Sequence, residues 1–305
     1  MAQSNTYKYE NGRRYQAYKD DGTYLLPHDE PEYLRLNTQH VLLRMCTDGQ
    51  LALAPLAPDK PIMVLDIGTG TGIWAREFVD EYPQATVVGV DLSLPETDDL
   101  PARLEMRTGD LEADWSTFLP DEEKFDYIHA RMFCAAIKDP RRMLQQAVKH
   151  LKPGGWFEWQ ELHTRIFCAC PDVLDIDKCR HSCYWEAQQK LAAGIAKFGI
   201  DLWKGAALQP LFDQGGLYQN HQVVTTTPVG CWPEDKVDKE KGLLRRQVLL
   251  QGMESLYMGP LTKGLGMEKA EVDELLEKVR GELRADEARH YLKFHTYYGR
   301  KPTPG

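Results

Sequence analysis

The sequence predicts a doubly wound α/β fold, in which helices cover both faces of a largely parallel sheet. A short apolar segment at 62–67 leads into a glycine-rich turn and a helix, and a β-branched strand follows at 86–90. This order of strand, helix and strand needs a crossover connection, so the two strands are parallel. Strand and helix patterns continue to alternate up to residue 161, which indicates a sheet covered by helices.

The individual elements follow in order along the chain. Helical periodicity marks 72–81 and 141–151, and strand patterns cover 104–107, 125–129 and 155–161. Beyond Cys170 the alternation breaks down, and a polar stretch predicts one or two helices that suit a lid better than a layer over the sheet. We expect the remaining elements to be helices at 206–216, 239–258 and 268–283 and strands at 218–228 and 291–298.

The composition is that of an ordinary globular protein. The chain has 305 residues, of which 42% are apolar and 27% charged, so it can bury a large core without disulfides or metals. Its formal charge of −9 comes from 37 basic against 46 acidic residues. Because there is no long basic block to follow a phosphate backbone, nucleic acid is a poor candidate for a partner.

The N-terminal sequence and the cysteines indicate the cellular compartment of the protein. No apolar run approaches the roughly 20 residues that a membrane helix needs, and the polar start does not resemble a signal peptide. We therefore expect a cytoplasmic protein whose seven cysteines are reduced thiols. A cysteine cluster with the spacing C-x-C-x8-C-x3-C matches no common zinc site, so no metal is expected. It comprises Cys168, Cys170, Cys179 and Cys183, with His163 and His181 nearby.

The most informative segment is 64–75, VLDIGTGTGIWA. A buried strand runs into glycines that allow a tight turn close to a ligand, and a helix N-terminus follows. Gly70, Gly72 and Ala75 also fit the G-x-G-x-x-A form of a dinucleotide site. However, Asp66 precedes Gly68, and an acid so close to the loop repels a pyrophosphate but suits a ligand that carries an ammonium group.

Two further carboxylates end the neighbouring predicted strands. Asp91 closes V-V-G-V-D, where an acid can accept hydrogen bonds from both ribose hydroxyls, although dinucleotide sites use such an acid as well. Asp110 ends the third strand, where it can accept from an adenine amino group while Leu111 packs on the ring. Gly-Asp pairs also form ordinary turns, so this position alone decides little.

Together these motifs resemble a known family. The ordered set D-I-G-T-G-T-G, V-V-G-V-D, T-G-D-L, F-D-Y-I-H-A-R and L-K-P-G-G-W is similar to class I S-adenosylmethionine-dependent methyltransferases over 61–161. Short sequence segments at 11–15, 22–27 and 35–40 resemble the LaeA-like fungal methyltransferases of secondary metabolism. The resemblance implies a seven-stranded sheet of order 3-2-1-4-5-7-6 and a monomer or weak homodimer. No membrane partner is expected, because the chain lacks a long apolar run.

The resemblance also divides the chain and assigns a site. We expect an N-terminal helical cover at 1–55 and a methyltransferase domain at 56–305, with helical insertions at about 172–205 and 238–285. The glycine loop would surround the methionine moiety, and tyrosines of the cover, including Tyr18, would close over it. The residues expected to hold S-adenosylmethionine are Tyr15, Tyr24, Asp66, Gly68, Thr69, Gly70, Asp91, Leu92, Gly109, Asp110, Leu111, Arg131 and Met132.

The implied reaction moves a methyl group to an O, S or N atom of a small apolar or aromatic metabolite. An oxygen acceptor would benefit from a general base, for which His163, His129 and Glu161 are candidates. Aromatic residues beyond Cys170 that could line the acceptor pocket are Trp185, Trp203, Tyr257 and Tyr297. The alternative is a LaeA-type regulatory protein that acts through a protein complex rather than on a small molecule.

Overall fold

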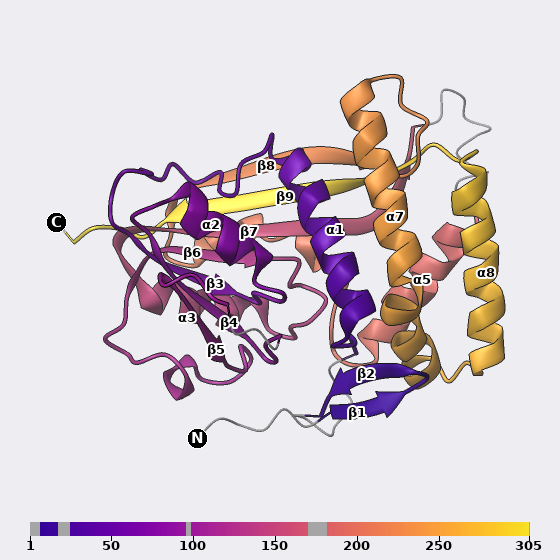
Figure 1. The fold of residues 1–305 in the computed structure, drawn as a ribbon, viewed down its shortest axis with the longest axis horizontal. Helices are drawn as coiled ribbons and strands as arrows, with labels where there is room; N and C mark the ends of the chain where they lie inside the picture. The colour runs from indigo at the N-terminus through magenta and orange to yellow at the C-terminus, as the bar shows by residue number, and fades with distance from the viewer. Residues whose placement is uncertain (1–6, 18–24, 96–98, 170–181, 305) are drawn as a thin grey trace. The chain divides into compact units, whose positions relative to one another are not determined.

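The fold centres on one seven-stranded sheet (Figure 1). The structure is a computed structural model that describes residues 7–17, 25–95, 99–169 and 182–304. The strands run in the order β5-β4-β3-β6-β7-β9-β8, which confirms the predicted order 3-2-1-4-5-7-6. Their bounds are β3 Met63–Ile67, β4 Thr86–Asp91, β5 Leu104–Thr108, β6 Phe125–Arg131, β7 Leu151–Cys168, β8 Tyr218–Pro228 and β9 His290–Arg300.

The neighbouring strands from β3 to β7 pair in parallel, as the strand–helix–strand pattern predicts. Strand β3 lies between β4 and β6, and β4 and β6 pair on their far sides with β5 and β7. The carboxyl ends of these strands therefore meet at one edge of the sheet. The described helices are α1 Glu30–Cys46, α2 Ile73–Glu81, α3 Pro140–His150, α5 Cys183–Ala196, α6 Gln209–Gln214, α7 Lys236–Gly259 and α8 Lys269–Ala285.

The chain forms two compact units that are interleaved in sequence. The first contains Met1–Cys46, His163–Trp203 and Thr225–Phe294, and the second contains Thr47–Leu162, Lys204–Val224 and His295–Gly305. Strands β7, β8 and β9 each contribute residues to both units. None of the helices in the described part of the chain is both long and apolar enough to cross a membrane.

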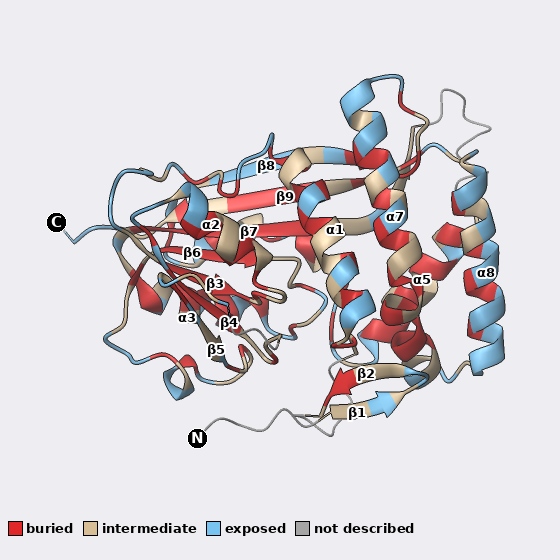
Figure 2. Cartoon of the chain, viewed as in Figure 1, coloured by how far each residue is buried: buried red, intermediate tan, exposed pale blue. Residues whose placement is uncertain are grey.

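In the second unit, apolar residues fill both faces of the sheet. On one face Trp74 and Phe78 of α2 pack with Tyr127 of β6. On the other face a larger cluster includes Leu144 of α3, Phe212 of α6 and residues of β6, β7 and β9. The central strands are therefore buried on both sides, as the red strands of Figure 2 show, and this explains their continuous apolar sequences.

The first unit begins with a hairpin, which the sequence analysis did not predict, and helix α1 of the expected helical cover follows it. Strands β1, Tyr7–Glu10, and β2, Arg13–Gln16, pair antiparallel. Asn11 and Gly12 form the turn with φ values of 51° and 77°, a conformation that Asn-Gly pairs favour. Arg13 then binds both carboxylate oxygens of Asp29, at 2.7 and 2.8 Å, which ties the hairpin to the start of α1.

The rest of the first unit is built from helices and the outer parts of the sheet strands. Helix α1 packs on α7, where a Cβ on Gly252 would lie only 2.7 Å from Cδ of Arg35. Arg35 is buried and bound by Glu32 at 2.7 Å. Helix α5 packs on α8 and on the π-helical turn η3, Pro260–Gly264. The helices predicted at 239–258 and 268–283 are confirmed as α7 and α8, within a few residues.

Candidate cofactor site

The loop between β3 and α2 turns on glycines with left-handed backbone. Gly68, Gly70 and Gly72 have φ values of 71°, 57° and 75°, a region that residues with a Cβ avoid. The amides of Gly68 and Thr69 donate to the carbonyl of Val90, at 2.8 and 3.0 Å. The loop is thereby held against the end of β4, with the N-terminus of α2 directly behind it.

Asp91 links this loop to the neighbouring strand. Its Oδ2 accepts a hydrogen bond from the amide of Gly70 at 2.8 Å, while the amide of Gly109 donates to its carbonyl at 2.9 Å. Burial raises the pKa of the Asp91 carboxyl, and the nearby charge of Asp66 acts in the same direction. The glycine loop and the ends of β4 and β5 therefore form one connected edge.

Asp66 lies at the centre of a buried group of polar and aromatic side chains. Its Oδ2 accepts from the hydroxyl of Thr69 at 2.6 Å, and its Oδ1 lies 2.7 Å from Nδ1 of His129. The ring of Trp74 stacks on the His129 ring, with centroids 3.8 Å apart and planes 6° apart. His129 is 1% exposed and burial lowers its pKa, while its contact with Asp66 helps to hold that carboxylate in place.

The turn after β6 is fixed by Glu161. The Glu161 Oε2 atom accepts from the amides of Phe133 and Cys134, at 2.8 and 2.9 Å. Met132 has a left-handed φ of 56°, and its amide donates to the carbonyl of Gln160 at 2.9 Å. The Phe133 ring then lies against the glycine loop, where a Cβ on Gly68 would be 2.8 Å from it.

Glu161 and Arg131 both lie near the turn after β6, and the hydrogen bonds of Glu161 indicate its role there. Glu161 is 4% exposed, and burial raises the pKa of its carboxyl. Its bonds to backbone amides identify it as a residue that positions the turn after β6. Arg131 is the last residue of β6 and is half-buried at the same edge as Asp66.

Asp110 and its neighbours extend the edge at β5. Asp110 directly follows Gly109, and its Oδ1 accepts from the amide of Glu112 at 3.0 Å. Leu92, next to Asp91, is half-buried. Leu111 is 6% exposed and belongs to the large core cluster, so most of its side chain is already covered.

A methyltransferase-domain family model matches residues 38–216, which is more than half of the chain and includes the whole glycine loop and its carboxylates. This chain belongs to that methyltransferase family. It is an S-adenosylmethionine-dependent methyltransferase, which confirms the resemblance, the fold class and the cofactor that the sequence predicts.

Curated relatives match this methyltransferase over nearly its whole length. "Methyltransferase pytC" of Aspergillus terreus is 33% identical over 297 residues, covering 97% of this chain and 88% of the relative. "Secondary metabolism regulator LAE1" of Cochliobolus heterostrophus is 32% identical, covering 99% and 96%. "Protein-methionine methyltransferase laeA" of Emericella nidulans is 29% identical, covering 99% of this chain and 78% of the relative.

The residues present fit S-adenosylmethionine. The left-handed glycines leave a cradle without Cβ atoms, and the carboxylates of Asp66, Asp91 and Asp110 lie at the ends of adjacent strands. An ammonium group, ribose hydroxyls and an adenine amino group are all donors, so each can bind one of these acceptors. The cofactor supplies an electrophilic methyl group on a sulfonium, and the methyltransferase supplies its binding and orientation.

Most of the remaining predicted site residues lie in the first unit, Tyr297 lies in the second unit, and two lie outside the described residues. Tyr15 lies in β2 and is 7% exposed, and the Lys263 amine lies 5.9 Å from its ring centroid. Contact between Tyr15 and the cofactor stays a prediction. Tyr18 and Tyr24 lie outside the described residues. His163 is half-buried on β7 and is the most accessible of the three candidate bases. Of the aromatic candidates, Tyr257 and Tyr297 are buried, while Trp185 and Trp203 are partly exposed.

The cysteines differ in part from the expectation of reduced thiols. Cys168 is disulfide-bonded, whereas Cys46, Cys134, Cys183 and Cys231 are free. Cys170, Cys179 and His181 lie outside the described residues. Within the described ranges, no group of three or more His, Cys, Asp or Glu side chains could hold a metal ion.

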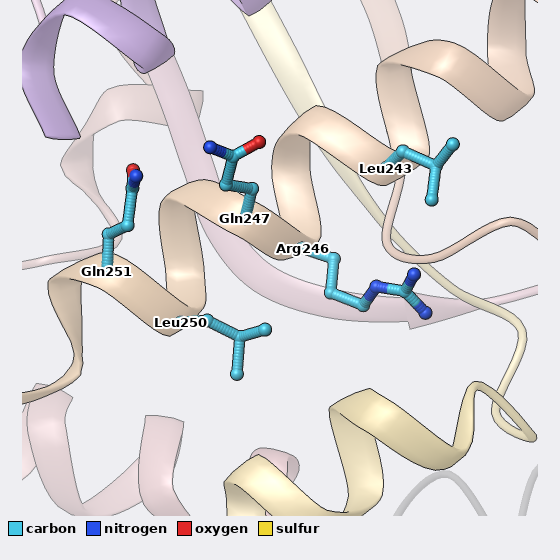
Figure 3. A pocket seen from close by; sticks show the side chains of 5 residues that line it. All are labelled: Leu243, Arg246, Gln247, Leu250 and Gln251. Atoms are coloured by element: carbon cyan, nitrogen blue, oxygen red, sulfur yellow. The ribbon is translucent and has the colours of Figure 1, made fainter. Parts of the chain in front are cut away.

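A surface hollow of about 400 Å³ lies along α7, away from the glycine loop in sequence (Figure 3). Its lining combines apolar and polar side chains from successive turns of this one helix, and Arg246 forms an ion pair with Asp286 at 3.3 Å. The described residues that line the hollow include no acid, histidine or thiol, so they offer no general base or nucleophile. The lining residues are Leu243, Arg246, Gln247, Leu250 and Gln251.

Sequence reasoning missed a buried network behind the site. Glu158 Oε2 accepts from the amides of Leu53 and Ala54, at 2.9 and 2.7 Å, and its Oε1 accepts from Gln160 Nε2 at 2.7 Å. Trp74 Nε1 donates to the carbonyl of Leu51 at 3.0 Å. The segment before β3 is thus tied to α2 and β7. The available signal was the pair of polar residues at alternate positions in the apolar run of β7.

The raised pKa of Asp91 makes cofactor affinity dependent on pH. Ribose hydroxyls donate to the ionised carboxylate, so affinity for S-adenosylhomocysteine should fall on acidification, starting above the ordinary value of 3.8. The limiting slope is about tenfold per pH unit. Isothermal titration across pH, with Asp91→Asn as a weak and less pH-dependent control, measures this. Identical pH profiles for both proteins would show that Asp91 does not contact the cofactor.

Proposed function

We propose that this methyltransferase acts on an O, S or N atom of a small-molecule secondary metabolite of aromatic or apolar character. The observation that carries the proposal is the match of 33% identity to "Methyltransferase pytC" over 97% of the chain, on a sheet with the strand order that the family resemblance implies. The acidic net charge of −9 favours a small acceptor over nucleic acid. We also propose a cytoplasmic protein that acts as a monomer or weak homodimer, with no membrane partner.

The main task of the protein in methyl transfer is to position the acceptor atom and the methyl group close to one another. Methyl transfer is an in-line displacement, and holding the acceptor atom about 3 Å from the methyl carbon supplies much of the rate. Asp66 and Asp91 would orient the cofactor from two adjacent strand ends. If the acceptor is a hydroxyl, His163 is the candidate base whose side chain is not buried.

The test is a transfer assay with methyl-labelled S-adenosylmethionine and a metabolite extract, with the product identified by mass. We expect label in a small molecule with the purified protein and about a hundredfold less with Asp66→Asn, whose reduced cofactor affinity is argued below. A folded protein that binds the cofactor but labels no metabolite would contradict the proposal.

A second candidate is regulation through a protein complex, which the names of two relatives favour. One is called a secondary metabolism regulator and another a protein-methionine methyltransferase. The same assay separates the two functions, because label that precipitates with protein and is absent from the metabolite fraction supports this candidate.

A further inference from the structure

One face of the first unit gathers aromatic rings and cations on neighbouring strands. His163, Arg165 and Phe167 occupy alternate positions of β7, and Tyr291 and Lys293 occupy alternate positions of β9. Alternate residues of a strand point to the same face of a sheet. The rings of Phe167 and Tyr291 stack with centroids 5.4 Å apart and planes 22° apart, so the two rows share a face.

Trp203 continues this surface beyond β7. The His163 ring meets the ring of Phe167 edge-on at 5.3 Å and that of Trp203 edge-on at 6.5 Å. The Arg165 guanidinium lies 5.5 Å from the Trp203 ring centroid, and the Lys293 amine lies 4.4 Å from that of Phe167. We call this set the aromatic–cation platform; its members are His163, Arg165, Phe167, Trp203, Tyr291 and Lys293.

The platform remains partly open to solvent. Arg165 is exposed, and its other members are only half-buried, in contrast to the fully covered rings of Phe157 and Tyr297 on the same two strands. Half-covered rings on a sheet face leave apolar area for another molecule to cover.

The charge of the platform identifies the kind of molecule that fits. The chain carries a net charge of −9, yet neither Arg165 nor Lys293 forms an ion pair with any carboxylate in the described ranges. Each cation lies over a ring, which uses one direction of approach and leaves N–H donors for an anion. Flat rings offer stacking area, and the two donors offer positive charge at the rim.

We propose that the aromatic–cation platform binds a small planar aromatic anion, such as an aromatic carboxylate. The ring of the ligand packs against the half-buried aromatic side chains of the platform, and its carboxylate accepts hydrogen bonds from Lys293 and Arg165. Because the platform includes His163, the candidate base, this proposal deepens the proposed function and rests on it, although its test measures binding alone and needs no methyl transfer.

The test uses 2-naphthoate as the anion and 2-naphthamide as its neutral counterpart, titrated into the full-length protein by calorimetry. We expect naphthoate to bind more tightly than naphthamide, and Lys293→Met and Arg165→Gln each to weaken naphthoate by about five- to tenfold. Naphthamide affinity should change little. The matched controls are Lys190→Met on α5 and Arg284→Gln on α8, which remove the same charges elsewhere in the first unit.

Each other outcome overturns the proposal. Equal affinities for the two probes, or unchanged naphthoate binding in both platform variants, would show that the cations do not recognise an anion. A change in sedimentation of the variants without a change in naphthoate binding would assign the platform to contact between two copies of the chain. The transfer assay with labelled S-adenosylmethionine tests the proposed function separately, and S-adenosylhomocysteine should bind equally to all these variants.

Discussion

An Asp66→Asn variant is expected to keep its fold and to lose about a hundredfold in affinity for S-adenosylmethionine. Asparagine has the same shape, and its amide oxygen can still accept from Nδ1 of His129, which lies 2.7 Å from Oδ1 in the native protein. The hydroxyl of Thr69 can rotate to accept from the new amide group. What the substitution removes is the negative charge that attracts an ammonium group.

Two further variants separate charge from packing. Asp66→Ala should lose the same affinity and also destabilise the fold, because it leaves His129 buried beside a cavity. Asp59→Asn, an exposed acid of the same unit, should change neither property. Thermal melts and titration with S-adenosylmethionine measure both effects. Full affinity in a folded Asp66→Asn protein would mean that the acid ending β3 serves only to hold the loop.

The central strands and their parallel pairing could be predicted because burial leaves a direct trace in the sequence, whereas the order of the seven strands came from the resemblance to the family. Strand β3 is an apolar run that enters left-handed glycines, and these allow one backbone path toward α2. The crossover then fixes the hand and the parallel pairing of β4. The positions of Asp66, Asp91 and Asp110 near the ends of adjacent strands could therefore be predicted without knowledge of any side-chain contact.

The N-terminal hairpin was missed although its turn signal was present. Asn11-Gly12 is a strong hairpin pair, but the flanking Y-K-Y-E and R-R-Y-Q are polar and carry no apolar alternation. Their pairing is supported by a distant contact, the double hydrogen bond from Arg13 to Asp29. A contact across 16 residues between charged side chains cannot be read from local periodicity.

The role of each polar residue was harder to predict than its position. His129 and Glu161 end up at the correct edge of the sheet, but their partners are Asp66 and the backbone amides after β6. These partners lie 63 and 28 residues away in sequence, so only the folded sheet brings them together. A carboxylate or imidazole near a strand end therefore has several possible roles until its hydrogen bonds are known.

The stability of the protein is expected to fall as the pH rises from about 5 to 8 through the buried Glu158. Burial raises the pKa of this carboxyl from 4.5 to about 7, so the native state holds a proton there that the unfolded chain releases. The contribution to stability is therefore full below pH 4.5 and is lost as the pH passes about 7. A shift of this size corresponds to about 3 kcal/mol.

A Glu158→Gln variant removes this titration while its amide oxygen can still accept from the amides of Leu53 and Ala54. The free energy of unfolding in urea, measured at pH 5, 6, 7 and 8, should fall in the native protein relative to the variant. Glu122→Gln, which replaces an exposed acid of the same unit, should follow the native profile. A constant difference between native protein and Glu158→Gln across this range would mean that Glu158 is already ionised in the fold at pH 5. The amides of Leu53 and Ala54 would then stabilise its charge strongly enough to offset the cost of burial.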